Sequence, residues 1–209
     1  MVINFFGRRG SGKTTTIKGN LAYYKRPVLI VDVLGNFDDD DEIIQTQSIG
    51  HAINEFAKQK ANSNESRPIS LRTSDPQLAA EYFSSAIWKG RGGTLVLDEV
   101  DTIRYKDGSC FDEYIRYGRN RGGDLITGCR RPAELDRNIT AAANKFYCFS
   151  THEPRDIEYF SDTLFGDEAW TLRNMPQFSG LFIDYDNKRK GTFHIDPEGN
   201  IYHDQEVTF

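Results

Sequence analysis

The stretch GRRGSGKTTT at residues 7–16 decides the fold, and it directly follows the apolar run from Val2 to Phe6. It matches the pattern G-x-x-x-x-G-K-[ST], and it lies between an expected strand and an expected helical segment at residues 15–24. Glycines at these positions let backbone N–H groups turn inward around a β-phosphate, and the helix N-terminus adds its dipole. The stretch therefore predicts a loop that binds the phosphates of a nucleotide.

The residues of this loop have distinct expected roles. We expect Lys13 to bridge the β- and γ-phosphates and the Thr14 hydroxyl to ligate Mg²⁺. Solvated side chains are the alternative to phosphate contacts for the two arginines in the variable positions. The candidate nucleotide-binding residues are Gly7, Arg8, Arg9, Gly10, Ser11, Gly12, Lys13, Thr14 and Thr15.

A second motif, TLVLDE at residues 94–99, is an apolar run that ends in two adjacent carboxylates. Asp98 is suited to hold the shell of a magnesium ion, and Glu99 is suited to polarise an attacking water. A hydrolase needs such a carboxylate, whereas a small-molecule kinase or a slow GTP switch usually does not place one there. The alternative is that Glu99 caps the following turn or pairs with an arginine.

The order of elements predicts an α/β fold with three layers and a mainly parallel sheet. Helical patterns alternate with buried strands: Ile49, Ile53 and Phe56 share one face, and so do Leu78, Tyr82 and Ile87 behind an Asp75 cap with Pro76 in the first turn. A third helix is expected to begin at Pro154 and end at Gly166, with Ile157, Phe160 and Leu164 on its apolar face. The expected strands are 2–6, 28–31, 94–97, 125–127 and 146–149.

Beyond about residue 175 the pattern changes to alternation and turns, which predicts antiparallel hairpins added to the sheet edge. We expect a single P-loop domain over residues 1–209, with a core of about 1–165 and an antiparallel extension of about 175–209. The segment KQKANSNESR, residues 58–67, has the composition of a loop.

Charge and composition limit the class of protein. With 209 residues and a net charge of −5, the chain lacks the broad positive field that lets a lone protein grip a phosphate backbone. No apolar run approaches the roughly 20 residues of a membrane span, so we expect a cytoplasmic protein with no membrane insertion. Cys110, Cys129 and Cys148 are expected to be reduced, buried thiols.

Arginines gather around the expected strand at 124–127. Arg130 follows the carboxyl end of this strand, where ligands gather in open α/β sheets, so we expect it to sense the γ-phosphate of the same chain. Arg119 stands before the other end, which suits a finger that reaches the nucleotide of a neighbouring subunit. Arg116 and Arg121 share this possibility. Ordinary surface salt bridging is the alternative for each of these arginines and for Arg131.

The set GRRGSGKT, TLVLDEVD, RYGRNRGGDLI and CRRPAEL resembles the HerA/FtsK superfamily of RecA-like motor ATPases. It is most similar to the genome-packaging ATPases of tailless icosahedral double-stranded DNA viruses. The resemblance covers residues 1 to about 165. It implies ATP and Mg²⁺ as cofactors, hydrolysis between subunits of a homo-oligomeric ring, and a trans finger at Arg119. One departure is Arg130, which stands where the family commonly has a glutamine before Arg-Pro.

The same resemblance implies partners and a location. The ring would pull double-stranded DNA through its centre, together with capsid vertex or portal proteins, in the host cytoplasm or associated with the virion. Candidate pore residues are Lys89 and Arg91, or the turn at 188–190, because a few basic residues repeated around a ring concentrate positive field. Two other functions stay open: a phage assembly motor of the zonula-occludens-toxin type, and a nucleotide kinase.

Overall fold

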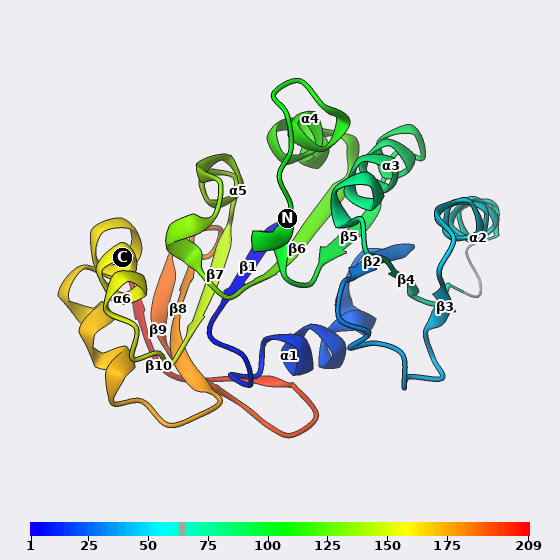
Figure 1. The fold of residues 1–209 in the computed structure, drawn as a ribbon. Helices are drawn as coiled ribbons and strands as arrows, with labels where there is room; N and C mark the ends of the chain where they lie inside the picture. The colour runs from blue at the N-terminus through cyan, green and yellow to red at the C-terminus, as the bar shows by residue number, and fades with distance from the viewer. Residues whose placement is uncertain (63–65) are drawn as a thin grey trace. The chain divides into compact units, whose positions relative to one another are not determined.

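The computed structural model describes residues 1–62 and 66–209. It divides into two compact units (Figure 1). The Asp98 unit comprises Met1 and Leu21–Thr127, and the phosphate-loop unit comprises Val2–Asn20 and Gly128–Phe209. Each unit has its own strands and helices.

The Asp98 unit is built on parallel strands in the order β6-β5-β2-β4-β3. Three α-helices and short 3₁₀ turns accompany them: α2 (Ile49–Ala61), α3 (Pro76–Lys89), α4 (Cys110–Tyr117), η1 (Leu21–Tyr23), η2 (Val100–Thr102) and η3 (Gly118–Arg121). The strands are β2 (Val28–Asp32), β3 (Ile44–Thr46), β4 (Ile69–Arg72), β5 (Gly93–Leu97) and β6 (Gly123–Cys129), the last of which belongs to this unit up to Thr127.

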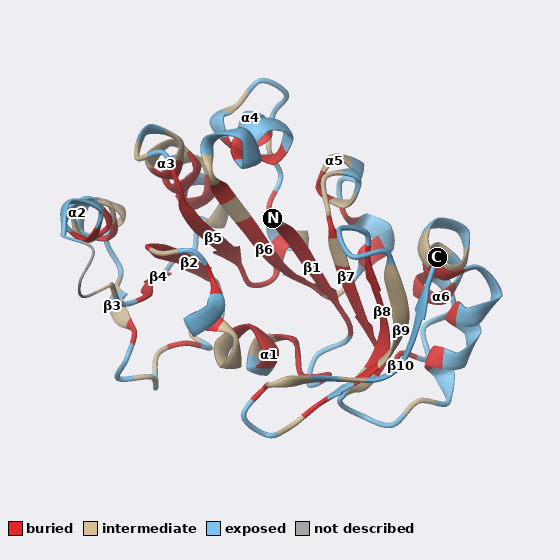
Figure 2. Cartoon of the chain, turned by 180° about the vertical axis from the view of Figure 1, so that it is seen from behind, coloured by how far each residue is buried: buried red, intermediate tan, exposed pale blue. Residues whose placement is uncertain are grey.

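The strands predicted from apolar runs are confirmed, and their residues are buried. Every residue of β2 and of β5 is buried, as the red strands of Figure 2 show, which accounts for the apolar runs at 28–31 and 95–97. The short strands β3 and β4 were not predicted. Gln45 and Ser70 interrupt their apolar pattern, and pairing with β2 and with each other is what makes these segments extended.

Helix α3 begins as predicted, because the Asp75 side chain accepts a hydrogen bond from the Leu78 N–H and Pro76 occupies the first turn. Of the predicted apolar face, Ile87 is buried, but the prediction is wrong for Leu78 and Tyr82, which are exposed. The face toward β2 and β5 instead carries Ala79, Ala80, Phe83, Ser84 and Ile87.

Helix α2 buries Phe56 and Ala52, with Ile49 and Ile53 half-buried beside them. The predicted loop over residues 58–67 is wrong at its start, because α2 continues to Ala61. Residues 63–65 of that predicted loop lie outside the described residues.

The phosphate-loop unit has strands in the order β10-β9-β8-β7-β1. Strands β1 and β7 are parallel, and the remaining pairs are antiparallel, so the predicted C-terminal hairpins are confirmed. Its elements are β1 (Val2–Phe6), α1 (Lys13–Gly19), η4 (Pro132–Glu134), α5 (Arg137–Ala141), β7 (Lys145–Phe149), α6 (Pro154–Phe160), η5 (Ser161–Phe165), η6 (Gly166–Arg173), β8 (Ser179–Asp184), β9 (Arg189–Ile195) and β10 (Ile201–Thr208).

Helix α6 begins at Pro154 as predicted and continues as a π-helical turn over Ser161–Phe165. Gly166, at a φ of 58°, ends that turn, and a 3₁₀ segment follows. Ile157 and Phe160 are buried and Leu164 is half-buried, so the predicted apolar face is present.

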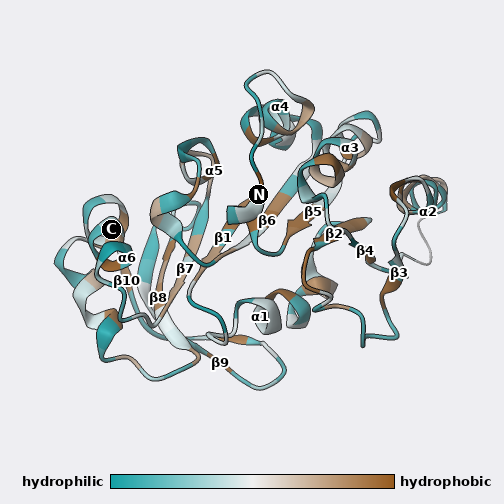
Figure 3. Ribbon diagram, viewed as in Figure 1, coloured by the Kyte–Doolittle hydropathy of each residue, from teal (hydrophilic) through white to brown (hydrophobic). Residues whose placement is uncertain are grey.

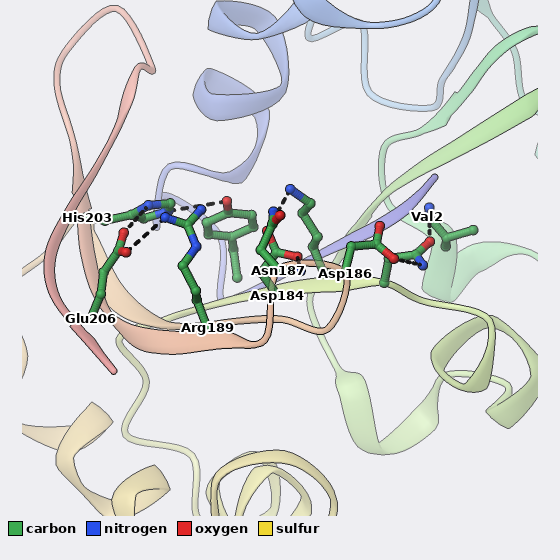
Figure 4. Close-up of polar contacts among 10 residues, drawn as sticks. Val2, Asp184, Asp186, Asn187, Arg189, His203 and Glu206 are labelled. Carbon is green, nitrogen blue, oxygen red and sulfur yellow. Dashed lines mark hydrogen bonds and ion pairs between the residues drawn. The ribbon is translucent and has the colours of Figure 1, made fainter. Parts of the chain in front are cut away.

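Polar contacts fix the antiparallel extension to its neighbours (Figure 4). The Val2 N–H donates to Asn144 Oδ1 at 2.9 Å, and Asn144 Nδ2 donates to Asp186 Oδ1 at 2.9 Å. Lys145 pairs with Asp184 at 2.8 Å across β7 and β8. These bonds tie the turn after β8 to β7 and β1.

The predicted α/β class with a mainly parallel arrangement and antiparallel C-terminal strands is therefore confirmed. Hydrophobic residues concentrate in strands such as β5, which Figure 3 colours brown. Within residues 1–62 and 66–209, none of the helices combines the length and apolar character that crossing a bilayer requires.

Candidate nucleotide site

The backbone of the predicted phosphate loop has the conformation that its glycines permit. Gly10 and Gly12 have φ values of 77° and 111°, in the region that residues with a side chain rarely adopt. Gly12 is the N-cap of α1, and the Gly7 N–H donates to the Cys129 carbonyl at 3.1 Å. The loop thus leads from β1 directly into a helix N-terminus, which favours binding of a phosphate.

Two buried polar side chains of the loop fit a phosphate ligand. The Lys13 ammonium donates to the carbonyls of Gly7 at 2.7 Å and Arg8 at 3.2 Å, and only 4% of the residue is exposed. The buried Ser11 hydroxyl has no hydrogen-bond partner among the described residues. A buried polar group without a partner is costly, and a phosphate oxygen would supply one.

The remaining candidate residues of the loop differ in their exposure. Thr14 is half-buried, whereas Thr15, Arg8 and Arg9 are exposed. The Thr16 hydroxyl is occupied, since it donates to the Gly12 carbonyl at 2.8 Å and fastens the first turn of α1.

Residues after α6 that the sequence did not indicate also contact the loop. Gln177 Nε2 donates to the Gly10 carbonyl at 2.9 Å. A methyl group on Gly12 would lie 3.1 Å from Phe178 Cδ1 and 2.6 Å from Ile195 Cδ1. Nothing in the local sequence marks these residues, because the start of β8 and the end of β9 reach the loop only in the folded chain.

The turn between β9 and β10 packs against α1, below it in Figure 1. A methyl group on Gly199, which has a φ of 90°, would come within 2.1 Å of the Thr15 carbonyl oxygen. Asn20 Nδ2 donates to the Gly199 carbonyl at 3.0 Å. The C-terminal extension therefore supports the helix that carries the phosphate loop.

In the Asp98 unit, the two predicted carboxylates follow β5 and are buried. Asp98 is 2% exposed and Glu99 is 5% exposed. Glu99 has a φ of 68° and stands at the N-cap position of η2, but its side chain makes no capping hydrogen bond there. The capping alternative is therefore wrong. A non-glycine residue held at positive φ is strained, and such strain collects at functional sites.

A carboxylate and an amide that the sequence did not indicate support Asp98. Asp32, at the end of β2, accepts hydrogen bonds from the backbone N–H groups of the loop at 34–37, at 2.9 to 3.2 Å. That loop carries Asn36, whose Nδ2 donates to Asp98 Oδ2 at 2.9 Å. Bonds of this type orient a carboxylate that binds a metal.

The arginines of the stretch at 116–121 differ in their surroundings. Arg116 pairs with Asp112 at 2.7 Å, and the Arg121 guanidinium lies 5.2 Å from the centre of the Trp88 ring. These two arginines therefore have partners on their own chain, in agreement with the salt-bridging alternative for Arg116. Arg119 is exposed on η3.

In the phosphate-loop unit, Arg130 is half-buried just beyond β6, and Arg131 pairs with Glu134 at 3.2 Å. Nearby, burial raises the pKa of Asp156 to about 6, with a further contribution from Glu153 and an opposing one from Arg131. Arg131 thus belongs to a local ionic cluster.

The cysteines carry free thiols in the described part of the chain. Cys129 and Cys148 are buried as predicted, and burial raises the pKa of Cys148 well above its usual value. Cys110 is exposed, so the prediction was wrong for this residue. The described residues contain no group of three or more His, Cys, Asp or Glu side chains arranged to hold a metal ion.

No protein-family model and no curated protein matches the chain. Solved structures do match the chain. The genome packaging NTPase B204 from Sulfolobus turreted icosahedral virus 2 in complex with AMPPCP matches with a TM-score of 0.73 at 18% identity, over 92% of this chain and 96% of that chain. Its complex with ATP-gammaS gives a TM-score of 0.71 at 17% identity, over 92% and 95% of the two chains.

The chain shares the RecA-like fold of these structures. A more distant similarity is to EccC (ATPases 2 and 3) from Thermomonospora curvata, with a TM-score of 0.50 at 13% identity over 91% of this chain and 35% of that chain. The RecA-like fold predicted from the motifs is thus confirmed by structures of low sequence identity.

Proposed function

We propose that the chain is an ATP-hydrolysing, oligomeric motor that translocates double-stranded DNA during packaging of a viral genome. The observation that carries the proposal is Glu99, a buried carboxylate held at positive φ immediately after Asp98. Burial of a carboxylate on a strained backbone lowers the stability of the fold, and such strain is found where a side chain takes part in catalysis. The similarity of the fold to genome packaging NTPase B204 supports the same function.

In this proposal the phosphate loop binds ATP. Lys13 exchanges its bonds to loop carbonyls for bonds to the β- and γ-phosphates, and the Ser11 hydroxyl gains a phosphate partner. Thr14 and Asp98 supply oxygen atoms, the donors that Mg²⁺ prefers, and would hold the ion together with phosphate oxygens and waters. The bound ion would neutralise negative charge that develops on the phosphates.

Glu99 acts as the general base in this proposal. Its carboxylate accepts a proton from a water molecule while the water oxygen forms a bond to the γ-phosphorus. The bond between the γ-phosphorus and the bridging oxygen breaks, and ADP and inorganic phosphate leave. Arg130, beyond β6, would sense the γ-phosphate on the same chain, and Arg119 would reach the nucleotide of the neighbouring subunit.

A homo-oligomeric ring would resolve the conflict between a net charge of −5 and a DNA substrate. Lys89, the last residue of α3, and Arg91 are both exposed and are candidates for the ring's DNA contact. The turn at 188–190 is the other candidate. There, Arg189 pairs with Glu206 and Lys190 pairs with Glu168, so two of its cations are neutralised. Capsid vertex or portal proteins and a location in the host cytoplasm belong to the same proposal.

The test is release of inorganic phosphate from ATP with and without duplex DNA at low salt, with light scattering to report the oligomeric state. We expect hydrolysis that rises with DNA and falls by about 100-fold or more in Glu99→Gln. Glu113→Gln, which changes an exposed glutamate of α4, is the matched control and should keep full activity.

Three results would contradict the proposal. Unchanged turnover in Glu99→Gln would show that Glu99 is not the general base. A rate indifferent to DNA, with the capsid or portal partner present, would count against translocation. Transfer of the γ-phosphate to an acceptor nucleotide rather than to water would identify a kinase.

A further inference from the structure

Phe178 combines exposure with backbone strain. It lies in the turn before β8, 43% exposed, and its φ is 65°. A bulky residue at positive φ is an outlier, and such outliers are found at ligand clamps. Asn or Gly would relieve the strain at this position. The chain instead exposes an aromatic ring there.

The position of this ring relative to the phosphate loop is fixed from several sides. Phe178 Cδ1 lies 3.1 Å from the place of a methyl group on Gly12, which is the residue before Lys13. The preceding residue, Gln177, is bonded to the Gly10 carbonyl. The following residue, Ser179, begins β8 and bonds through its hydroxyl to the Pro176 carbonyl at 2.7 Å. The ring is thus held beside the loop.

A phosphate loop recognises only the phosphates of its ligand, so the base of a bound nucleotide needs a separate contact. Phe178 belongs to the same compact unit as the loop, and its partly exposed ring lies within a few ångströms of Gly12. Ile195 is the last residue of β9 and contacts the same glycine. Its apolar side chain therefore lies beside the Phe178 ring at the loop. An aromatic face and an aliphatic neighbour form a surface suited to a flat base.

We propose that the Phe178 ring stacks on the base of the nucleotide whose phosphates occupy the loop at residues 7–15. This inference rests on the proposed function, because it takes the ligand of the loop to be a nucleoside triphosphate. Every base has an aromatic face, so stacking contributes affinity with little discrimination between bases. The chain is then expected to bind other nucleoside triphosphates with affinities close to that for ATP.

The experiment compares two ligands by calorimetric titration of the full chain: ATP-gammaS, which has a base, and inorganic tripolyphosphate, which has none. We expect Phe178→Ala to weaken binding of ATP-gammaS by about 10- to 100-fold, the range for loss of one stacked base, and to leave binding of tripolyphosphate unchanged. Phe178→Tyr keeps the ring and should retain the affinity. Phe178→Gly removes the ring and also relieves the strained φ, so it serves if the alanine variant does not fold.

Tyr185→Ala is the matched control. Tyr185 follows the other end of β8 and is 42% exposed, so it presents as much aromatic surface as Phe178 but far along the strand from the loop. Its removal should leave both affinities unchanged.

Three outcomes would overturn the inference. Equal weakening of both ligands would make Phe178 a residue that only positions the loop. Unchanged binding of ATP-gammaS without the ring would show that the base lies elsewhere, with Phe178 free to contact another subunit. Failure of the unmodified chain to bind either ligand would contradict the proposed function as well as the inference. This result therefore differs from the first two, which contradict only the role of Phe178.

Discussion

Asn36 donates a hydrogen bond to Asp98 across 2.9 Å, and this bond depends on the buried carboxylate of Asp32, which holds the loop that carries Asn36. The bond occupies Asp98 Oδ2 and fixes the orientation of the carboxylate. A carboxylate that is oriented in advance binds a metal with less loss of entropy.

We therefore predict that Asn36→Ala raises the Mg²⁺ concentration for half-maximal hydrolysis by about 10-fold, within the range for loss of a residue that orients a metal ligand. Binding of ATP-gammaS without Mg²⁺ should not change, since the phosphate loop is untouched. Titration of phosphate release against Mg²⁺ measures the effect, and Asn54→Ala on the exposed side of α2 is the control. The same Mg²⁺ dependence in both variants would contradict the assignment of Asp98 to the metal.

Asp32 should be more important for stability than an exposed cap of similar chemistry. Its fully buried carboxylate accepts four backbone hydrogen bonds, and Asp32→Ala would leave those N–H groups without their acceptor. We expect a loss of about 3 kcal/mol or more in the free energy of unfolding, measured with urea. Asp75→Ala removes only the exposed cap of α3 and should cost about 1 kcal/mol. Equal losses in the two variants would show that the bonds to Asp32 contribute no more than one cap.

The elements whose signals are local could be predicted from the sequence. The phosphate loop, the pair Asp98-Glu99, the Asp75 cap and the C-terminal hairpins all depend on short patterns. Gln177 and Asn36 could not be found in this way, because their partners Gly10 and Asp98 are distant in the chain. For them, only the packed structure brings donor and acceptor together.

Helix α3 shows why a spacing argument can select the wrong face. Leu78 and Tyr82 are the large apolar residues at helical spacing, yet they are exposed. The helix contacts β2 and β5, and its buried residues include the small Ala79 and Ala80 together with Phe83. The spacing of the large apolar residues alone therefore did not identify the buried face.

His203 should make the stability of the chain depend on pH. Its ring stacks on Phe182 at a centroid distance of 4.1 Å. The same ring contacts Glu206 at 2.9 Å (Figure 4). Burial lowers its pKa below the usual value, and the nearby Arg189 and Lys145 act in the same direction, while Glu206 opposes them. The folded state therefore prefers the neutral ring, and its stabilisation is complete above about pH 6.5, the value for an unfolded chain.

As the pH falls below about 6.5, the unfolded chain binds a proton more readily than the folded chain, and this stabilisation is lost. We predict that the free energy of unfolding decreases less between pH 7 and pH 5 in His203→Phe, which keeps the stacked ring but does not titrate. If His203→Phe also follows the unmodified curve, the histidine does not contribute to the acid sensitivity.

The last prediction concerns the division of the active site between subunits. Arg119 is exposed on η3, and its proposed role is to act on the nucleotide of a neighbour, whereas Lys13 serves the loop of its own chain. Each of Arg119→Ala and Lys13→Ala should lower hydrolysis by about 1000-fold or more when assembled alone. In mixed rings some interfaces combine an intact loop with an intact arginine, so part of the activity should return.

Measurement of phosphate release against the mixing ratio, in assemblies shown by mass to contain both variants, separates the two modes of action. Recovery that passes through a maximum at intermediate ratios is expected for an arginine that acts in trans. With Arg116→Ala in place of Arg119→Ala, the subunits should lose little activity even alone, because Arg116 is engaged with Asp112 on its own chain. Complete inactivity at every ratio of the first pair would place Arg119 in the site of its own chain, since no interface could then be complemented.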